Sequence, residues 1–536
     1  MKIGLAQIEI AAGRPEINSA KILNFVEQAK SQECDAVIFP AAAISGRLFT
    51  AQAAYLRECE NYCKEIIEAS EGITIIFGNI NDIFVANDGK LAHHLRDKFI
   101  FTGDLDEMHL CFAFDSAPFV LGNNLERENL NTARVAEVKR PLIYVNGVGM
   151  QNSGKTIYTF SGESTVYNSA GKAVVRVEPY IEKLQVVDFD EIENLPEIKI
   201  ETEPEVAEIY RALNYGVDKF LKQIGMSKVV IGISGGIDSA VAAALYTKIL
   251  GAENILLVNM PSVFNSATTR NLSEQLAKNL GCKYAVVPIQ KSVDSTVRQL
   301  ELTPVNFLRD DSTEEIKISG FVRENLQARD RSGRILATLA AALGGGFTCN
   351  ANKAESTIGY CTLYGDSAGF LAATADLWKF QVYDLARYLN EKIYEREVIP
   401  QGIIDIVPSA ELSDAQNVDE GKGDPLHYDY HDYLFRAFVE KLAAPEDILN
   451  WYAAGNLEAQ IGCAEGLVAK YFPTAQDFIA DLERWWKQFT GIAVAKRIQS
   501  PPIMAVTSRA FGSFAESQNG VHFTQNYLKL KASYAG

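Results

Sequence analysis

The sequence has few cysteines, a deficit of basic charge and no long hydrophobic runs, and each shortage excludes a class of protein. Eight cysteines in 536 residues, with no Cys-x-x-Cys pair, argue against a disulfide scaffold or a structural zinc motif. The net charge of −17 argues against a general nucleic-acid binder, because phosphate neutralisation needs a basic surface. No apolar run approaches the roughly 18 residues that a membrane helix requires. The alternating start of the chain predicts a buried strand instead of a signal peptide. We therefore expect a cytoplasmic protein that binds neither nucleic acid nor membrane.

Length and composition predict two or three folded domains. Hydrophobic residues make up 47% of the chain and charged residues 22%, as in soluble globular proteins. Residues 1–190 mix short apolar strands with helical patterns and predict a layered α/β domain. The expected helices cover 17–30 and 51–69, and the expected strands cover 73–80, 98–101, 142–148, 156–160, 173–177 and 184–189. The acidic, proline-punctuated stretch 191–205 is the best linker candidate.

Residues 206–536 predict a second domain, built on a doubly wound parallel sheet. A helix at 206–224 precedes a strand at 228–233, a glycine turn and a helix from about 239, and strand–helix units follow at 255–260 and 284–289. The ligand site of such a sheet lies at the carboxyl ends of its strands. From about 425 the chain becomes helical and aromatic.

Two pairs of potential metal ligands are better explained by packing. Cys59 and Cys63 lie four residues apart on an expected helix, and we interpret them as buried thiols. His427 and His431 have the same spacing but lack the glutamate of a His-Glu-x-x-His zinc site, so we expect a structural aromatic turn.

The segment IGISGGIDS at 231–239 carries the strongest chemical signal. Glycines at the end of a buried strand let backbone N–H groups approach a ligand, and the following helix contributes its positive N-terminus. This combination predicts a phosphate cradle. Asp238 would repel phosphate unless a cation lay between them, which implies Mg²⁺. The residues expected to hold the nucleotide are Gly232, Ser234, Gly235, Gly236, Asp238 and Ser239. This segment contains no GxxxxGK, so the loop is not a Walker A loop.

This segment resembles the pyrophosphatase loop of ATP-dependent synthetases that release AMP and pyrophosphate, the adenine nucleotide α-hydrolase-like group. Later segments resemble the ordered motifs of the NAD synthetase family over roughly 206–515. They are MPS at 260–262, ENLQAR at 324–329, NKAE at 352–355, GYCTLYGD at 359–366, PSAEL at 408–412 and KR at 496–497.

The resemblance implies that the carboxylate of deamido-NAD attacks the α-phosphate of ATP, and that ammonia then displaces AMP from the adenylate to form NAD. It implies Mg²⁺ at Asp238 and Glu355, a catalytic role for both and for Lys353, and an ATP contact at Asn350. It assigns the dinucleotide to Asn325, Arg329, Glu355, Tyr360, Asp366 and Lys496. We also expect a homo-oligomer. The chain departs from the family pattern in the segment 349–355, where Cys349, Ala351 and Ala354 stand, and at Phe380, which replaces a common threonine; these departures put the rate in doubt.

The front domain resembles the nitrilase-like glutaminase that is fused to larger NAD synthetases. The family's catalytic glutamate follows a Phe-Pro turn, where this chain has Ala41 in the stretch FPAAAISG at 39–46. The interval that should carry the family's lysine and cysteine is short, and Lys98 and Cys111 are its only candidates. We interpret Cys111 as a core residue. The expectation is therefore a non-catalytic front domain, a degenerate glutaminase, and the use of free ammonia or of ammonia from a separate glutaminase partner.

Two other functions stay open at this stage. One keeps the adenylating chemistry but acts on a different carboxylate, as the altered segment at 349–355 would allow. The other is a non-catalytic oligomerising or regulatory protein, against which the intact SGGIDS segment argues.

Overall fold

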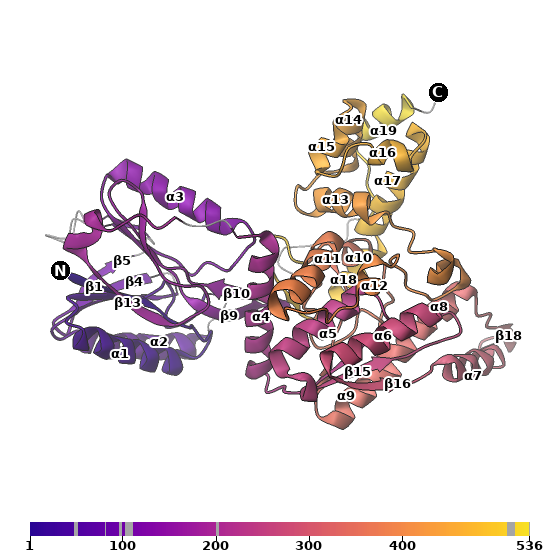
Figure 1. Cartoon of the computed structure of the whole chain (residues 1–536), viewed down its shortest axis with the longest axis horizontal. Helices are drawn as coiled ribbons and strands as arrows, with labels where there is room; N and C mark the ends of the chain where they lie inside the picture. Colours follow the sequence, from indigo (N-terminus) through magenta and orange to yellow (C-terminus); the bar gives the residue numbers. More distant parts are fainter. Residues whose placement is uncertain are drawn as a thin grey trace. The chain divides into compact units, whose positions relative to one another are not determined.

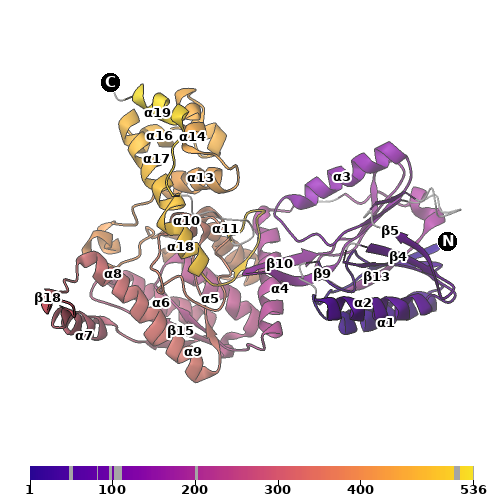
Figure 2. The ribbon, with the colours of Figure 1, turned by 180° about the vertical axis from the view of Figure 1, so that it is seen from behind.

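The computed structural model describes residues 1–47, 52–80, 82–95, 99–101, 111–199, 203–511 and 520–534. Two compact units make up the chain, and each is drawn from both sides in Figures 1 and 2. The first contains Met1–Phe220 and Ala505–Thr507, and the second contains Leu221–Met504 and Ser508–Gly536. The expected linker at 191–205 thus falls within the first compact unit. Compactness alone does not fix where a domain's own sequence ends, so the limits 1–190 and 206–536 stay a prediction.

The first unit is a sandwich of two sheets with helices outside. One sheet has the order β13-β1-β2-β3-β4-β5 and the other β12-β11-β8-β7-β6. Figure 1 shows α1 and α2 on one side of the sheets and α3 on the other. The bounds are β1 Lys2–Gln7, α1 Pro15–Ser31, β2 Ala36–Ile38, α2 Ala53–Glu68, β3 Thr74–Asn79, β4 Asp82–Asn87, β5 Lys90–Leu95, β6 Phe99–Phe101, β7 Cys111–Phe114, α3 Asn123–Val138, β8 Leu142–Val145, β11 Thr165–Tyr167, β12 Ala173–Arg176 and β13 Lys183–Asp188. Between β8 and β11 the chain forms a hairpin of β9 Val148–Ser153 and β10 Thr156–Ser161. The helix α4 Glu205–Gln223 comes after β13.

Three buried clusters account for the layers of this unit. The inter-sheet cluster contains Leu5 and Ile76 from the first sheet and Phe112 and Val145 from the second. A second cluster lies beneath α1 and α2, and a third beneath α3. Because successive side chains of a strand point to opposite faces, each sheet contributes to one inner and one outer cluster.

The second unit is built on a parallel four-stranded sheet in the order β16-β15-β14-β19. The strands are β14 Val229–Gly232, β15 Ile255–Asn259, β16 Lys283–Val286 and β19 Gly346–Phe347. Helices α5 Ile237–Leu250, α6 Ala267–Leu280, α7 Gln290–Glu301, α8 Gly320–Arg329 and α9 Ala337–Leu343 connect or flank them, with a hairpin of β17 Pro304–Phe307 and β18 Ser312–Glu315. The helix α5 is apolar on nearly all sides and almost wholly buried, as expected for a helix at the centre of such a fold.

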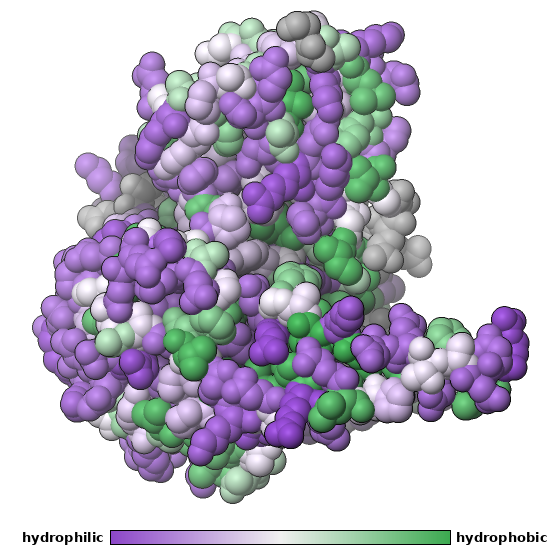
Figure 3. All heavy atoms as spheres, turned by 90° about the vertical axis from the view of Figure 1, so that its right-hand side faces the viewer, coloured by the Kyte–Doolittle hydropathy of each residue, from purple (hydrophilic) through white to green (hydrophobic). Residues whose placement is uncertain are grey.

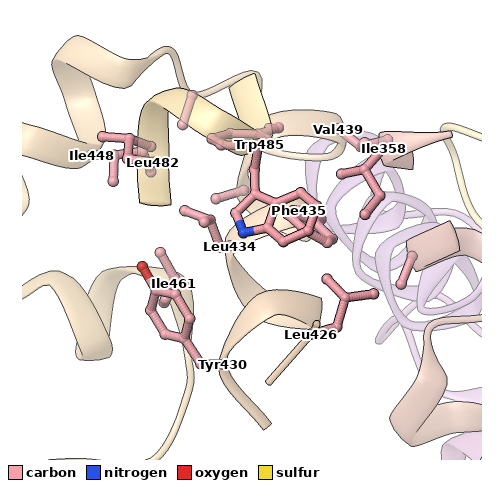
Figure 4. Close-up of a cluster of buried hydrophobic side chains, with 14 of the residues drawn as sticks. Ile358, Leu426, Tyr430, Leu434, Phe435, Val439, Ile448, Ile461, Leu482 and Trp485 are labelled. Carbon is pink, nitrogen blue, oxygen red and sulfur yellow. The ribbon is translucent and has the colours of Figure 1, made fainter. Parts of the chain in front are cut away.

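The last part of the second unit is helical. It comprises α10 Lys353–Ile358, α11 Lys379–Tyr388, α12 Gln401–Asp405, α13 Tyr428–Val439, α14 Pro445–Ala453, α15 Leu457–Ile461, α16 Leu467–Tyr471, α17 Ala475–Thr490, α18 Ile492–Gln499 and α19 Gln525–Ala532. Figure 4 shows its core, where Phe435 and Leu434 of α13 lie near Trp485 of α17. Among the described residues no helix has the length and apolarity needed to cross a membrane.

The α/β fold class, with a two-sheet nitrilase-like sandwich, a parallel sheet and a helical C-terminal region, confirms the prediction from sequence. The strands expected at 73–80 and 156–160 are present within one or two residues at each end. Neither α3 nor the hairpin of β4 and β5 was predicted. The helix α3 carries seven charged or amide side chains in its first ten residues, so its apolar stripe is narrow.

Candidate active site

The turn between β14 and α5 has the geometry of an anion cradle. Gly235 has a φ of +93°, and an added Cβ would lie 2.4 Å from the carbonyl oxygen of Thr269. Glycine is therefore required by both backbone conformation and close approach. The amide of Gly236 donates to Ser234 Oγ over 3.2 Å, and Ser239 Oγ donates to the carbonyl of Gly236 over 3.0 Å. Since no side chain caps α5, its first amides face the turn, where a phosphate would lie.

A cavity of about 390 Å³ opens at this turn. Eleven of the fourteen residues that the sequence predicts for the synthetase site line it. They are Ser234, Gly235, Gly236, Asp238, Ser239, Asn325, Asn350, Glu355, Tyr360, Asp366 and Lys496. Segments more than 250 residues apart in the chain thus meet around one space, as the ordered motifs predicted.

Both carboxylate oxygens of Asp238 have partners. Lys379 Nζ donates to Oδ2 over 2.5 Å, and Asn352 Nδ2 donates to Oδ1 over 3.0 Å. Burial alone would lower the pKa of the Lys379 ammonium, but the charges of Asp238 and Glu355 raise it above its ordinary value. Lys379 is therefore a fixed cation at the mouth of the glycine turn. It was not among the residues that the sequence predicted for the site.

Glu355 lies beside Asp238 at the start of α10. Its backbone amide donates to Asn352 Oδ1 over 3.0 Å, and its Oε2 accepts from the Asn352 amide, which forms a capping box. Burial raises the pKa of Glu355 well above its ordinary range, and the negative charge of Asp238 raises it further. A cation near these two carboxylates would favour their ionised forms.

Lys353 does not enter the cavity, which corrects the prediction that it takes part in the chemistry. Its side chain is fully buried, and Nζ lies 2.8 Å from Asp376 Oδ1 and 3.2 Å from Glu440 Oε1. The ring of Trp378 packs 5.2 Å from the same nitrogen. The first turn of α10 directs Glu355 toward Asp238 and the side chain of Lys353 into the protein interior.

Two more predicted residues lie outside the lining. Arg329 Nε donates to the carbonyl of Leu363 over 3.1 Å on the exposed side of α8. Gly232 is behind the turn, where its carbonyl accepts from Asn350 Nδ2 over 3.1 Å. Both residues form hydrogen bonds next to the cavity but do not line it.

The far end of the cavity is polar and hydrogen-bonded. Tyr360 Oη donates to Asp424 Oδ1 over 3.1 Å and accepts from Gln416 Nε2 over 2.8 Å. Asp366 Oδ1 accepts from the amide of Thr362 over 2.7 Å, and burial raises the pKa of its carboxyl. Lys496 Nζ donates to the carbonyls of residues 359 and 361, each over 2.6 Å.

Asn325 completes this end through its side-chain oxygen, which accepts from Thr362 Oγ1 over 2.9 Å. The sequence missed five charged residues that line the same cavity, namely Glu324, Arg331, Lys379, Glu411 and Asp424. Arg331 Nε donates to the carbonyl of Met260 over 3.1 Å, and burial lowers its pKa to about 10. Glu411 accepts from the Ser266 amide and from Thr269 Oγ1. Arg331 stands two residues after Arg329 and lines the cavity, whereas Arg329 does not.

The first unit places apolar side chains where a glutaminase would need its base. Ala41 is 2% exposed and belongs to the inter-sheet cluster. Its amide donates to the carbonyl of Asp115, directly after β7, over 3.1 Å. Cys111 packs in the cluster beneath α3, whereas Phe112 and Phe114 of the same strand pack with Ala41. The thiol therefore faces the other side of the sheet from Ala41, and burial raises its pKa. Lys98 lies outside the described residues.

The paired histidines and cysteines are structural. His431 Nδ1 accepts from the amide of His427 over 2.8 Å, and its Nε2 lies 3.1 Å from Asp481. Cys59 and Cys63 are buried in the cluster beneath α1 and α2. No cluster of three or more metal-ligating side chains occurs in the described ranges.

Comparisons with known proteins agree with the geometry. The NAD synthase family profile matches residues 209–460. A glutamine-dependent NAD(+) synthetase from Synechocystis is 34% identical over 76% of this chain, which spans 65% of that relative, and one from Xylella fastidiosa is 27% identical over 96% of this chain and 97% of its own length. The structure of a glutamine-dependent NAD(+) synthetase from Cytophaga hutchinsonii has a TM-score of 0.75 over the full length of both chains at 16% identity, and that of the Acinetobacter baumannii enzyme with ADP has a TM-score of 0.64 over 96% of this chain at 23% identity.

The family match covers the glycine turn, the Asp238 and Glu355 pair and the polar far end of the cavity except Lys496. The alignments with the Xylella relative and both solved structures extend over the first unit as well. The second unit therefore matches the NAD synthase family, and the whole chain is similar to glutamine-dependent NAD(+) synthetases.

Proposed function

We propose that this chain amidates deamido-NAD to NAD at the expense of ATP, through an adenylate intermediate and with release of AMP and pyrophosphate. One observation carries the proposal: a single continuous cavity joins the phosphate-type turn at 234–239 to the polar group around Tyr360, Asn325 and Lys496. The carboxylate of a substrate bound at the polar end would then reach the α-phosphate of an ATP bound at the glycine turn. Such positioning converts a bimolecular reaction into an effectively unimolecular one.

Amides, hydroxyls and charged side chains each have a separate role in binding the phosphates. The amides at the start of α5 and the hydroxyls of Ser234 and Ser239 bind phosphate oxygens. Lys379, now on Asp238, moves its hydrogen bond to a phosphate oxygen as the nucleotide binds, and Arg331 supplies a second cation across the cavity. Positive groups fixed in advance stabilise the charge that develops on the leaving pyrophosphate.

Asp238 and Glu355 fit a magnesium ion that arrives with the nucleotide. The repulsion that raises the pKa of Glu355 is relieved by a divalent cation shared with Asp238. Two carboxylates, with the remaining positions left to phosphate and water oxygens, are typical of Mg²⁺ sites on nucleotides. When bound, the ion neutralises charge on the phosphates.

Pyrophosphate release tests the proposal. The purified chain is given ATP and Mg²⁺ with deamido-NAD and ammonium, or with a panel of other aromatic and aliphatic carboxylates. We expect release that depends on deamido-NAD and matches NAD formed. Release with a different carboxylate alone would favour the second reaction kept open by the sequence, and no release with any would favour a non-catalytic protein.

We propose further that the nitrogen comes from free ammonia. All four cysteines of the first unit, Cys34, Cys59, Cys63 and Cys111, pack in the outer clusters, away from Ala41. The stretches 96–98 and 102–110 lie outside the described residues, but their sequence contains no cysteine. A nitrilase-type glutaminase needs both a base and a thiol nucleophile, and among the described residues of this unit neither packs with Ala41 in the inter-sheet cluster.

Glutamine is the competing nitrogen source, and the names of the relatives favour it. The Xylella relative, which this chain matches over 96% of its own length, is named glutamine-dependent. The two sources are separated by glutamate release: ammonia use predicts none from glutamine, and glutamine use predicts one glutamate for each NAD. If ammonia is the source, a separate ammonia-supplying partner would act by raising its local concentration.

We propose that the chain forms a homo-oligomer through the second unit. Both strands of the hairpin β17 and β18 are exposed, and Leu308 beside it is 92% exposed. Leu302 and Phe321 are each 73% exposed on the flanking segments. Figure 3, which faces the side that carries α7 and β18 in Figure 1, shows hydrophobic residues at the surface among polar ones. Two strands alone are marginally stable, so a partner surface would stabilise them. The mass in solution, compared with that of Leu308→Asp, tests this proposal.

A further inference from the structure

The helix α11 begins at Lys379, and the amide of Trp378 before it donates to Gln381 Oε1 of the same helix over 2.9 Å. Trp378 occupies the N-cap position and its side chain makes no capping hydrogen bond. The carboxylate of Asp432, from α13, takes this role: Oδ2 accepts from the amide of Phe380 over 2.9 Å. A negative charge at a helix N-terminus is favourable because it meets the unpaired amides and the positive end of the dipole.

Asp432 is fully buried and lies outside the cavity lining. Its Oδ1 has no hydrogen-bond partner among the residues that the structure describes. Burial raises the pKa of this carboxyl to about 7, against the lowering effect of the Phe380 amide. A half-satisfied buried carboxylate is a poor device for stability alone. Its contacts are therefore informative, because the Phe380 amide that donates to Oδ2 and the Lys379 backbone, which also favours the ionised form, both belong to the first turn of α11.

The capped turn carries the cation of the active site. Lys379, the residue before Phe380, reaches Asp238 over 2.5 Å with a side chain that is only 4% exposed. The ammonium also lies 5.0 Å from the ring centre of Tyr428. Tyr428 and Asp432 are four residues apart on α13, so one face of that helix contacts both the ammonium and the backbone of the same turn.

We propose that Asp432 is a positioning residue for the ATP chemistry, which fixes the first turn of α11 so that Lys379 reaches the phosphates beside Asp238. The inference rests on the proposed function and adds to it a residue that touches no substrate. In this proposal, α13 holds Lys379 in position beside Asp238 and Glu355.

A double-mutant cycle tests the assignment. Asp432→Leu removes the cap, and we expect turnover with ATP, deamido-NAD and ammonium to fall by about 10- to 100-fold, the size of effect that a misplacement near 1 Å produces. Asp432→Asn keeps an oxygen for the Phe380 amide and should lose less. In a Lys379→Met background, which has already lost the ammonium, Asp432→Leu should cost nothing further in turnover.

Tyr430→Phe is the matched control, since Tyr430 is equally buried on α13 and its hydroxyl has no partner in the described structure. We expect Tyr430→Phe to leave turnover close to that of its parent in both backgrounds. If Asp432→Leu does not fold, Asp432→Asn is carried through the same cycle. An equal fold loss with and without Lys379, for whichever variant is used, would overturn the assignment and leave Asp432 a packing residue.

MgATP binding, measured by calorimetry on the same variants, separates this inference from the reaction itself. Asp432→Leu should weaken binding in the native background and leave it unchanged in the Lys379→Met background. If the native chain binds MgATP but does not amidate deamido-NAD, the proposed reaction fails while the cycle on ATP affinity still decides the role of Asp432. Weakening by the same factor in both backgrounds contradicts that role.

Discussion

The two units of this chain place a turn at the same point of an α/β layer, but one turn is packed with methyl groups and the other is open and charged. Ala41 follows β2 and is 2% exposed in the inter-sheet cluster. Asp238 follows β14 at the mouth of a cavity of about 390 Å³. The carboxyl ends of strands are suited to carry chemistry in both places. The difference shows that a fold supplies the position and the side chains decide whether it is used.

Of the substitutions that test the difference between the two turns, Asp238→Ala in the open turn should have the largest effect on activity. The change removes a metal ligand and frees Lys379 from its partner, so adenylation should fall by at least about 10³-fold, as when key charge-stabilising groups are removed. The fold should stay intact because Asp238 lies in the first turn of α5 on the cavity wall and not in a hydrophobic core. Pyrophosphate release and circular dichroism measure the two effects, and turnover like that of the unmodified chain would reject the assignment.

The next effect concerns the backbone of the same turn. Gly235→Ala forces a side chain onto a φ of +93° and to 2.4 Å from the Thr269 carbonyl, so MgATP binding should weaken by tenfold or more, with a strain of about 1–3 kcal/mol. Gly236→Ala is the control, since its added Cβ meets only Ser234 Oγ at 3.4 Å. Calorimetric titration with MgATP compares the pair. Equal affinities for the two variants would contradict the cradle geometry.

Lys353→Met separates stability from chemistry within the second unit. The substitution leaves Asp376 and Glu440 without their buried cation, and the free energy of unfolding should fall by about 3–5 kcal/mol. Lys379→Met should instead lower turnover by about 10²- to 10³-fold, to a rate that can still be measured, at a smaller cost in stability. Chemical denaturation and pyrophosphate release are measured on both. A stable but inactive Lys353→Met would return this lysine to the chemistry.

The smallest effect is expected in the packed turn of the first unit. Ala41→Glu restores the family's base but buries a carboxyl among apolar side chains, which should cost about 1–3 kcal/mol. Glutamine use should not appear, since no thiol lies in that cluster. The midpoint of thermal unfolding and glutamate release check these outcomes, with Ala41→Val as the apolar control. Glutamate released by the Ala41→Glu variant would show that a nucleophile is present after all.

The sequence predicted the fold and most of the site because both depend on local patterns in order along the chain. SGGIDS follows β14, ENLQAR ends α8, NKAE begins α10 and GYCTLYGD follows α10, and the structure brings residues of all four to one cavity. The α/β class and the parallel sheet followed from the spacing of the apolar strands.

The errors arose where a side chain's direction depends on distant parts of the chain. Lys353 is part of the NKAE motif, which predicted a catalytic role. Its side chain is held in the interior by Asp376 and Glu440, which are distant from it in sequence. Lys379 was not among the predicted site residues, and the packing of α11 against α5 and α13 directs it to Asp238. Such pairings are decided by tertiary packing, which a single sequence does not display.

One measurement tests the central contrast most directly: NAD and glutamate formed by the unmodified chain with ATP, Mg²⁺ and deamido-NAD, supplied with either ammonium or glutamine as the only nitrogen source. The chemistry of the second unit and the packed turn of the first predict NAD with ammonium, none with glutamine, and no glutamate. One glutamate released for each NAD formed from glutamine would contradict the account, and Cys111 would then be the first residue to substitute.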